Sequence, residues 1–221
     1  SEKELHKKTA FFNFIYSNPQ AYYLRDRIFH KISTYKKVDA LGKHFNNTKV
    51  QPTRDDANWR QISVQLKSKY KFSIAAENAK YPGYSSEKLL TSYRAHSIPI
   101  YFGDPEITDE YNQRSFILIT DETSLDIALK KIKEIDQNDD LWMEMIREPW
   151  MTKEQIQNAK QSYQDYIEFL NKIFMIPGKD AIRRPMGSYH DNYQIWFFRK
   201  YKYRKLNIKN IKKKIRLILK K

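Results

Sequence analysis

The stretch YKFSIAAENAKYPGYSSEKLLTSYRAHSIPIYFGDP, residues 70–105, decides the fold of this chain. Its segments 71–78 (KFSIAAEN) and 98–103 (IPIYFG) are short apolar runs, which are typical of buried strands. Between them, residues 85–97 (SSEKLLTSYRAHS) have the composition and length of a helix. A strand, a helix and a second strand in this order predict a parallel βαβ unit.

The same alternation of strands and helices extends on both sides of this unit. We expect further strands over residues 11–17, 38–43 and 115–120, and helices over residues 21–35, 57–70, 124–135, 139–149 and 152–174. In the first of these helices Leu24, Ile28 and Ile32 share one face. The pattern predicts an α/β fold with a parallel sheet and helices on both faces, followed by a helical C-terminal extension.

The turn AENAKYPGYSSEK, residues 76–88, carries more chemistry than a connection needs. Because it follows a strand, it lies at the carboxyl end of the sheet, where open α/β sheets bind ligands. The helix after it has Ser85 or Ser86 as its N-cap, so its free N–H groups favour an anion, usually a phosphate. Lys88 is unfavourable in a first helical turn unless an anion is bound nearby.

The other residues of this turn suit a sugar. Glu87 can accept hydrogen bonds from sugar hydroxyls, Tyr84 can hydrogen-bond or stack, and Gly83 allows a sharp bend. The fingerprints GxGxxG and GxxxxGK[ST] are both absent from the sequence. An ordinary capped helix with solvated Glu87 and Lys88 explains these residues equally well, so the residues alone leave both interpretations open.

Composition limits the class of protein. The chain has 221 residues, of which 40% are hydrophobic and 14% aromatic, as in globular proteins. Without cysteine it can form neither a disulfide, a thiolate zinc site nor a cysteine nucleophile. The sequence has no apolar run of the roughly 20 residues that a membrane-spanning helix needs and no signal-peptide pattern at its start. It also lacks an initiator Met, so we expect a processed or trimmed chain.

Residues 70–105 closely resemble the signature of the α-1,3/4-fucosyltransferases, glycosyltransferase family ten. That signature reads YKF-x-(L/I)-x-x-EN-S, then (D/G)Y-(V/T)-T-EK and (V/I)P(V/I)-x-x-G. Upstream, the segments 11–29 (FFNFIYSNPQAYYLRDRIF) and 38–47 (VDALGKHFNN) resemble further pieces of the family, as does 109–121 (DEYNQRSFILITD) downstream. The sequence departs from the signature at Ala79, Ser85 and Ser86, which are small residues that leave the pocket plausible.

The resemblance implies a Rossmann-like donor lobe of a GT-B glycosyltransferase that inverts the anomeric centre. Lys88 and Arg25 would hold the diphosphate of GDP-fucose. Tyr84 and Glu87 would contact its ribose or fucose, and Asn78 would help to shape the site. The implied reaction transfers L-fucose from GDP-fucose to a GlcNAc-type glycan acceptor, and no metal or other cofactor is strictly required.

The resemblance also implies a missing part. In the family, the amino-terminal lobe carries the acceptor site and the carboxylate thought to act as general base. We therefore expect the general base to lie outside this chain, and the 221 residues to be a piece of a longer enzyme rather than an independent donor-binding module. A transferase of the same fold that uses another nucleotide-sugar is the alternative.

The net charge of +15 is concentrated in the tail. Residues 199–221 hold 12 Lys and Arg residues and no acid, so residues 1–198 carry a net charge of only +3. Ile208, Ile211 and Ile215 recur at helical spacing among these lysines, which favours a basic amphipathic helix on an anionic membrane surface. A disordered basic tail and nucleic-acid binding are the rival interpretations. The near-neutral remainder and the lack of a nucleic-acid-binding motif argue against nucleic acid.

We accordingly expect three regions: a donor-binding lobe over residues 1–176, an aromatic connecting segment over 177–198 and a basic amphipathic tail over 199–221. The expected location is cytoplasmic with peripheral membrane attachment, as in bacterial members of the family. The five histidines show no metal-ligand spacing, and the acids in TRDD (53–56) and QNDD (137–140) read as loop and helix-start residues. We therefore predict no metal site.

Overall fold

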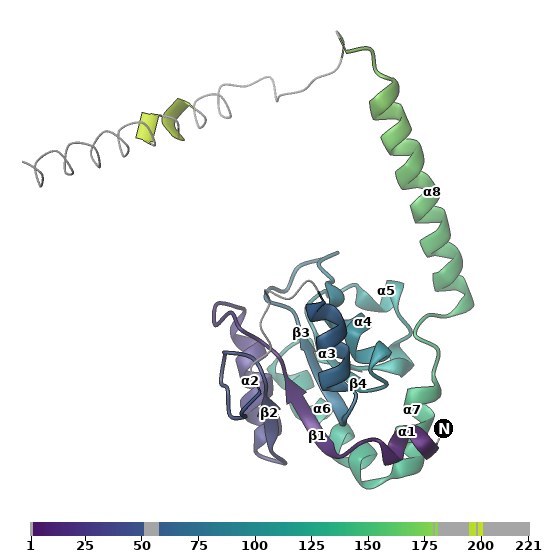
Figure 1. Ribbon diagram of the computed structural model, residues 1–221. Coiled ribbons are helices and arrows are strands. Elements are labelled where there is room, and N and C mark those ends of the chain that lie inside the picture. The colour runs from purple at the N-terminus through teal and green to yellow at the C-terminus, as the bar shows by residue number, and fades with distance from the viewer. Residues whose placement is uncertain (1, 51–57, 179, 181–194, 198, 201–221) are drawn as a thin grey trace, which may run out of the picture. The chain divides into compact units, whose positions relative to one another are not determined.

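The computed structural model describes residues 2–50, 58–178, 180, 195–197 and 199–200 (Figure 1). The chain divides into two compact units, Ser1–Ser162 and Tyr163–Lys221. The first unit holds the sheet, while helix α8 (Lys153–Met175) begins in the first unit and ends in the second. The boundaries that we expect after residues 176 and 198 stay predictions.

A five-stranded parallel sheet forms the centre of the first unit, with the strand order β2-β1-β3-β4-β5. The strands are β1 (Ala10–Phe14), β2 (Val38–Ala40), β3 (Tyr70–Ala76), β4 (Ile98–Phe102) and β5 (Ile117–Leu118). This arrangement confirms the α/β class and the parallel sheet predicted from the sequence.

Helices cover both faces of the sheet. They are α1 (Glu2–His6), α2 (Tyr23–Ser33), α3 (Trp59–Lys67), α4 (Glu87–Arg94), α5 (Ile107–Glu110), α6 (Glu122–Gln137) and α7 (Asp139–Arg147), with a 3-10 turn, η1 (Gln113–Ser115). Figure 1 shows α3 and α4 side by side in front of the strands, and the two helices contact each other. Helices α2, α6 and α7 pack on the opposite face.

The alternation of side chains along the strands produces two cores. In β3, Phe72 and Ile74 point into the larger core with α2, α6 and α7, while Ala75 points into the smaller core with α4. Tyr101 of β4 joins Ala75 in the smaller core. A period of two along a strand buried on both faces explains why β3 reads as an almost continuous apolar run.

The predicted strand over 11–17 ends at Phe14, and the predicted strand over 115–120 is only the two residues of β5. Both strands are shorter than predicted because residues at one end of each segment make other contacts. Ser115 belongs to the 3-10 turn η1, and the side chain of Tyr16 takes over hydrogen bonds to β3 after β1 stops pairing through its backbone.

The strand order creates a crevice between β1 and β3. The chain leaves β1 for β2 on one side of it, and then returns past β1 to form β3 on its other side. Helix α2, which follows β1, packs on one face, whereas α4, which follows β3, packs on the other. The loops after β1 and β3 therefore diverge, which is the point where doubly wound sheets bind their ligands.

Helix α8 differs from the helices around the sheet, because none of its side chains is buried. Among the described residues, no helix is both long and apolar enough to cross a membrane. The basic tail predicted to bind a membrane surface lies almost wholly outside the described residues.

Candidate functional site at the carboxyl end of the sheet

Glu77, the first residue after β3, organises the turn of residues 76–88. Its side chain is fully buried. Oε1 accepts hydrogen bonds from the backbone N–H of Ser86 at 2.8 Å and from its hydroxyl at 2.7 Å. Oε2 accepts from Nζ of Lys88 at 2.7 Å. A buried carboxylate is tolerated because a cation and two further donors satisfy it.

The start of α4 therefore differs from a common capped helix. Ser86 is the N-cap and is one of the two residues predicted for that position. Its hydroxyl, however, makes no capping hydrogen bond to its own helix. It donates to Glu77 instead. The acceptor for the backbone N–H of Ser86 is thus a carboxylate from the preceding strand, which fixes the helix start to the sheet.

Two glycines give this turn its shape. Gly83 has a φ of +72°, which a side chain rarely adopts, and this confirms the sharp bend expected there. Gly103, after β4, leaves room for Glu77, because a Cβ at that position would lie 2.5 Å from Cγ of Glu77. The buried position of the carboxylate therefore depends on a glycine from a neighbouring strand.

Tyr16 fixes the other side of the crevice. Its buried hydroxyl accepts a hydrogen bond from the N–H of Ala76 at 2.7 Å and lies 3.0 and 2.9 Å from the carbonyl oxygens of Ile74 and Ala76. Burial raises the pKa of this phenol far above its ordinary value, so it stays a neutral donor and acceptor. The chain after β1 is thereby fastened to the end of β3.

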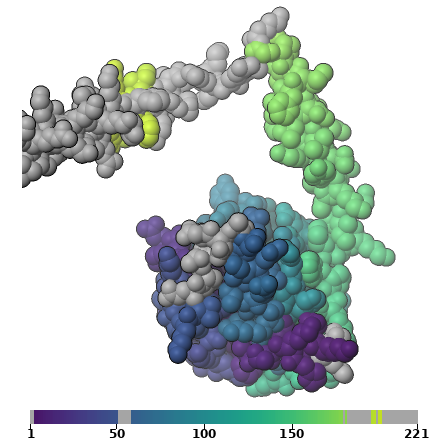
Figure 2. All heavy atoms as spheres, in the orientation of Figure 1, coloured from purple at the N-terminus to yellow at the C-terminus, as the bar shows by residue number. Residues whose placement is uncertain are grey.

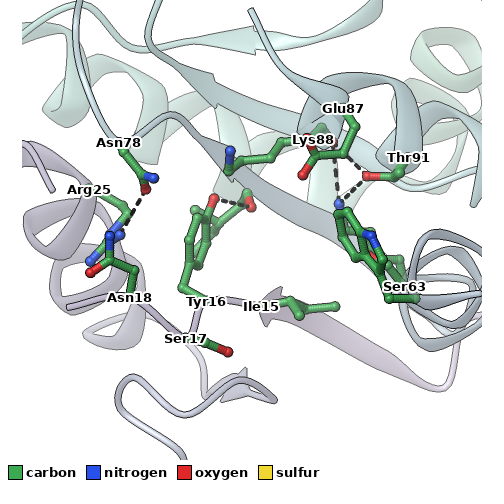
Figure 3. Close-up of a pocket in the computed structure, with 13 residues that line it drawn as sticks. Ile15, Tyr16, Ser17, Asn18, Arg25, Ser63, Asn78, Glu87, Lys88 and Thr91 are labelled. Atoms are coloured by element: carbon green, nitrogen blue, oxygen red, sulfur yellow. Dashed lines mark hydrogen bonds between the residues drawn. The ribbon is translucent and has the colours of Figure 1, made fainter. Parts of the chain in front are cut away.

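A pocket that is partly open to solvent lies between these two loops. It is lined from the β1 side by residues 15–18 and Arg25, from the β3 side by Asn78, Glu87 and Lys88, and from α3 by three further residues. Figure 3 shows Arg25 and Asn78 together at one side, Thr91 and Ser63 at the other, and Lys88 between them. The pocket thus occupies the crevice that the strand order predicts.

Arg25 is fully buried beside this pocket. Nε donates to Asp26 at 3.1 Å, Nη1 to Oδ1 of Asn78 at 3.2 Å and Nη2 to the carbonyl of Pro19 at 3.3 Å. The guanidinium also lies 5.0 Å from the ring centroid of Tyr16. Because a guanidinium has five N–H donors, these three contacts leave two N–H groups without a hydrogen-bond acceptor among the described residues.

Four of the five residues predicted to bind the donor therefore line one pocket: Arg25, Asn78, Glu87 and Lys88. The fifth, Tyr84, is 40% exposed on the turn and is not among the residues that line the pocket. Their roles toward a donor stay predictions. The structure adds that both cations have protein partners: Lys88 pairs with Glu77, and Arg25 donates to Asn78.

Sequence reasoning missed the contribution of α3. Trp59, Ser63 and Lys67, which recur every four residues, line the pocket from this helix. Figure 2 shows α3 at the surface, and Ser63 and Lys67 are its buried residues. The apolar residues Trp59, Ile62 and Leu66 of this helix are only half-buried. A search for apolar spacing does not find a polar face of this kind.

No cluster of three metal-ligating side chains occurs in the part of the chain that the structure describes. In QNDD, Asn138 caps the start of α7, because its side chain accepts hydrogen bonds from the N–H groups of Asp140 and Leu141. The neighbouring acid Asp139 pairs with Lys71 of β3. The acids of TRDD lie outside the described residues.

The fold and the pocket define a Rossmann-like α/β lobe with two cationic side chains in the wall of one pocket. Residues 5–175 match the model of glycosyltransferase family 10 (fucosyltransferase), carboxyl-terminal part. The chain belongs to this family.

Similar proteins agree with the family. One relative is a protein of Acanthamoeba polyphaga mimivirus that is provisionally named as a fucosyltransferase. The alignment covers 64% of this chain and 24% of the viral protein, and the aligned residues are 40% identical. The chain is 31% identical, over 62% of its length, to 29% of the GDP-fucose protein O-fucosyltransferase 3 of Xenopus laevis. The crystal structure of an alpha1,3-fucosyltransferase with GDP-fucose matches 66% of the chain, at 26% identity and a TM-score of 0.59.

The match covers 41% of the length of that solved chain. The chain thus spans less than half the length of each of these three proteins. The likeness to the solved structure agrees with the predicted fold, one lobe of a GT-B glycosyltransferase.

Proposed function

We propose that this lobe binds GDP-fucose and provides the donor site of an inverting fucosyltransferase. The observation that carries the proposal is one pocket, at the switch point of a parallel sheet, with Arg25, Asn78, Glu87 and Lys88 in its wall. Two cations suit a diphosphate, and a carboxylate and an amide suit sugar hydroxyls. The solved relative with GDP-fucose supports the choice of donor.

Binding would exchange protein partners for ligand. Lys88 pairs with Glu77, with 16% of its side chain exposed on the pocket side of that pair, so an entering diphosphate can share its charge. Arg25 would add its remaining N–H donors. Glu87 and Asn78 would bind ribose or fucose, and Tyr84 would contact the part of the donor nearest the mouth.

In the proposed reaction the acceptor hydroxyl attacks the anomeric carbon of fucose from the face opposite the diphosphate. The new C–O bond forms as the bond to the diphosphate breaks, GDP leaves with the electron pair, and a general base outside this chain takes the proton. Lys88 and Arg25 would stabilise the charge that develops on GDP, and we propose no requirement for a metal or other cofactor.

We propose a GlcNAc-type glycan as the acceptor, with an α-1,3 linkage. The solved relative is an alpha1,3-fucosyltransferase, which supports the linkage. The likeness to a protein O-fucosyltransferase favours a second candidate, the hydroxyl group of a protein side chain. A glycan array and a panel of folded protein acceptors, assayed with labelled GDP-fucose, would separate the two.

A thermal-shift titration with GDP, GDP-fucose, GDP-mannose and UDP-sugars tests the donor. We expect GDP compounds alone to raise Tm, and Lys88→Ala and Arg25→Ala to abolish the shift. Arg114→Ala, which changes an exposed arginine at a different pocket, is the matched control and should keep it. A response to UDP-sugars would favour the alternative donor, and no response to any nucleotide would contradict the proposal.

We further propose that residues 199–221 attach the protein to an anionic membrane surface in the cytoplasm. The support is the charge and the apolar spacing of this tail. The full chain should pellet with vesicles that contain anionic lipid, and a chain that ends at residue 198 should not. Equal pelleting of both forms would contradict the proposal.

A further inference from the structure

Lys67 is a buried lysine, and every acceptor that its ammonium group contacts among the described residues is neutral. It is the last residue of α3 and is 4% exposed. Nζ donates to the carbonyl oxygen of Lys88 at 3.3 Å, to Oγ1 of Thr91 at 2.8 Å and to Oγ of Ser92 at 3.1 Å. All three acceptors belong to the first turns of α4, which follow the site's turn.

These hydrogen bonds form one network around a single carbonyl. The hydroxyls of Thr91 and Ser92 both donate to the carbonyl oxygen of Lys88, at 3.1 and 2.8 Å. Each hydroxyl hydrogen is thereby used, so both oxygens can only accept from Lys67. Three acceptors match the three N–H donors of the ammonium form, whereas a neutral amine has only two. The protonated form of Lys67 therefore makes the full set of bonds to α4, including the bond to the backbone of Lys88, the residue proposed to bind the diphosphate.

The charged groups that face Lys67 do not neutralise it. Among the described residues, Glu87 of α4 and Glu77 at the end of β3 favour its charge, and Lys88 opposes it, but none of the three forms an ion pair with it. The loss of water around the group outweighs them and lowers its pKa to about 7.

The geometry also connects Lys67 to the ligand. Its side chain lines the same pocket as Lys88 and Arg25. An anion bound in that pocket would give Lys67 a nearby negative charge, which it does not have as an ion pair among the described residues. A negative charge close to an amine favours the protonated form of the amine.

We propose that Lys67 is a proton-linked positioning residue of the donor site. It gains a proton from solvent as the diphosphate binds, and its ammonium group then holds the first turn of α4 against the bound anion. This inference rests on the proposed GDP-fucose site. The only bond that changes is one N–H bond: the lone pair of Nζ takes a proton from solvent as the donor binds, and that proton returns to solvent when GDP leaves.

The sign of the pH dependence follows from this balance. Below the pKa of the free site, Lys67 is charged in both the free and the bound protein, so affinity is highest there. Above it, binding must also take a proton from solvent, and affinity falls. With a free pKa of about 7, the affinity for GDP-fucose should fall up to about tenfold from pH 6 to pH 8.

Isothermal titration calorimetry with GDP-fucose tests the inference. A phosphate monoester has a second pKa of about 6, so a probe with such a group would change its own protonation in this pH range. Both phosphates of GDP-fucose are esterified and lack that second ionisation, so the probe itself takes up no proton there. At pH 8, titrations in two buffers with different protonation heats count the protons. We expect the wild type to take up close to one proton per donor, and Lys67→Met to take up none and to bind with the same affinity at pH 6 and pH 8.

Lys8→Met is the matched control. Lys8 is a partly buried lysine at the opposite end of the sheet, bonded to the carbonyls of Ser68 and Ala95, and burial lowers its pKa to about 8. Its loss should leave proton uptake unchanged. His44, which contacts Asp26 beside Arg25, is intact in Lys67→Met, so proton uptake by His44 would persist in that variant.

The outcomes separate the two levels of inference. Binding by the wild type without proton uptake would overturn the role of Lys67 while keeping the donor site, as would uptake that persists in Lys67→Met. No binding of GDP-fucose at any pH would overturn the proposed function and the role of Lys67 together. The wild-type measurement decides the matter even if Lys67→Met does not fold.

Discussion

Two buried carboxylates, Glu77 and Asp136, lie at opposite ends of the sheet and have similar partners. Glu77 follows the carboxyl end of β3 and pairs with Lys88. Asp136, near the end of α6, pairs with Lys36 and accepts from the hydroxyl of Tyr35 at 2.8 Å, at the amino end of the strands. Both side chains have no exposed area.

The difference between them is the space beside the pair. At the amino end, Lys71 of β3 connects α6 and α7, because its Nζ donates to the carbonyl oxygen of Asp136 at 3.4 Å and to Oδ1 of Asp139 at 2.9 Å. At the carboxyl end the loops after β1 and β3 diverge, and Lys88 faces a pocket. The same kind of ion pair therefore supports packing at one end and borders a pocket at the other, because of the strand order.

Glu77→Ala should have the largest effect. Lys88 and the N–H of Ser86 would lose their buried acceptor, and the removal of one partner of a buried ion pair typically costs about 3–5 kcal/mol. We expect that loss in the free energy of unfolding, measured with urea, and a loss of affinity for GDP-fucose of at least about tenfold, which corresponds to roughly 1.4 kcal/mol. An unchanged affinity in the folded variant would show that Glu77 is structural only.

Asp136→Asn tests the other end. Lys36 and Lys71 keep some solvent, with 32% and 14% of their side chains exposed, so the expected loss of unfolding free energy is smaller, about 1–3 kcal/mol. The affinity for GDP-fucose should not change, since the whole length of the strands separates this pair from the pocket. A loss of affinity comparable to that of Glu77→Ala would remove the distinction between the two ends.

The pH dependence of stability should come from the carboxyl end through Lys67. Its folded pKa of about 7 lies below the unfolded value, so the folded protein binds fewer protons between these pKa values and stability rises with pH in that window. We expect a rise on the order of 1 kcal/mol between pH 7 and pH 8. Urea unfolding at both pH values should show it in the wild type and not in Lys67→Met; an equal rise in both would assign it elsewhere.

Arg27→Ala should have the smallest effect. Arg27 forms an exposed ion pair with Glu122, with Nε and Oε1 3.1 Å apart, and both side chains are largely in solvent. Exposed pairs are screened by water and salt. We expect no resolvable change in Tm or in GDP-fucose affinity, and a clear fall in Tm would mean that burial is not what separates the strong pairs from the weak ones.

Much of the fold could be predicted from the sequence, because strand and helix follow local periodicity. The spacing of Leu24, Ile28 and Ile32 predicts a buried helix face, and all three are buried in α2. The same rule gives α8 as a helix but says nothing about its partners, and none of its side chains is buried. The periodicity of a sequence describes a single helix or strand, whereas the burial of a side chain also depends on a second element that packs against it.

The site was predictable where chemistry and sequence position coincide. Lys88 and Asn78 stand in the quoted turn, and the pocket includes both. Glu77 was missed although it adjoins Asn78, because a carboxylate at the end of a strand does not show whether it faces solvent or a buried cation. Lys67 was missed because its role depends on contacts with residues 21 to 25 positions away in the chain.

The hydroxyl of Tyr16 sets the width of the opening between the two central strands. Backbone pairing of β1 with β3 is recorded up to Asn13 and Ser73, and beyond it one phenol spans the gap to the peptide groups of Ile74 and Ala76. The distance between the two walls of the pocket at this point is therefore the length of one tyrosine side chain. Phenylalanine has the same ring but no hydroxyl, so Tyr16→Phe would remove every hydrogen bond that this side chain makes to β3. A single oxygen atom thus holds the two walls of the pocket together at this point.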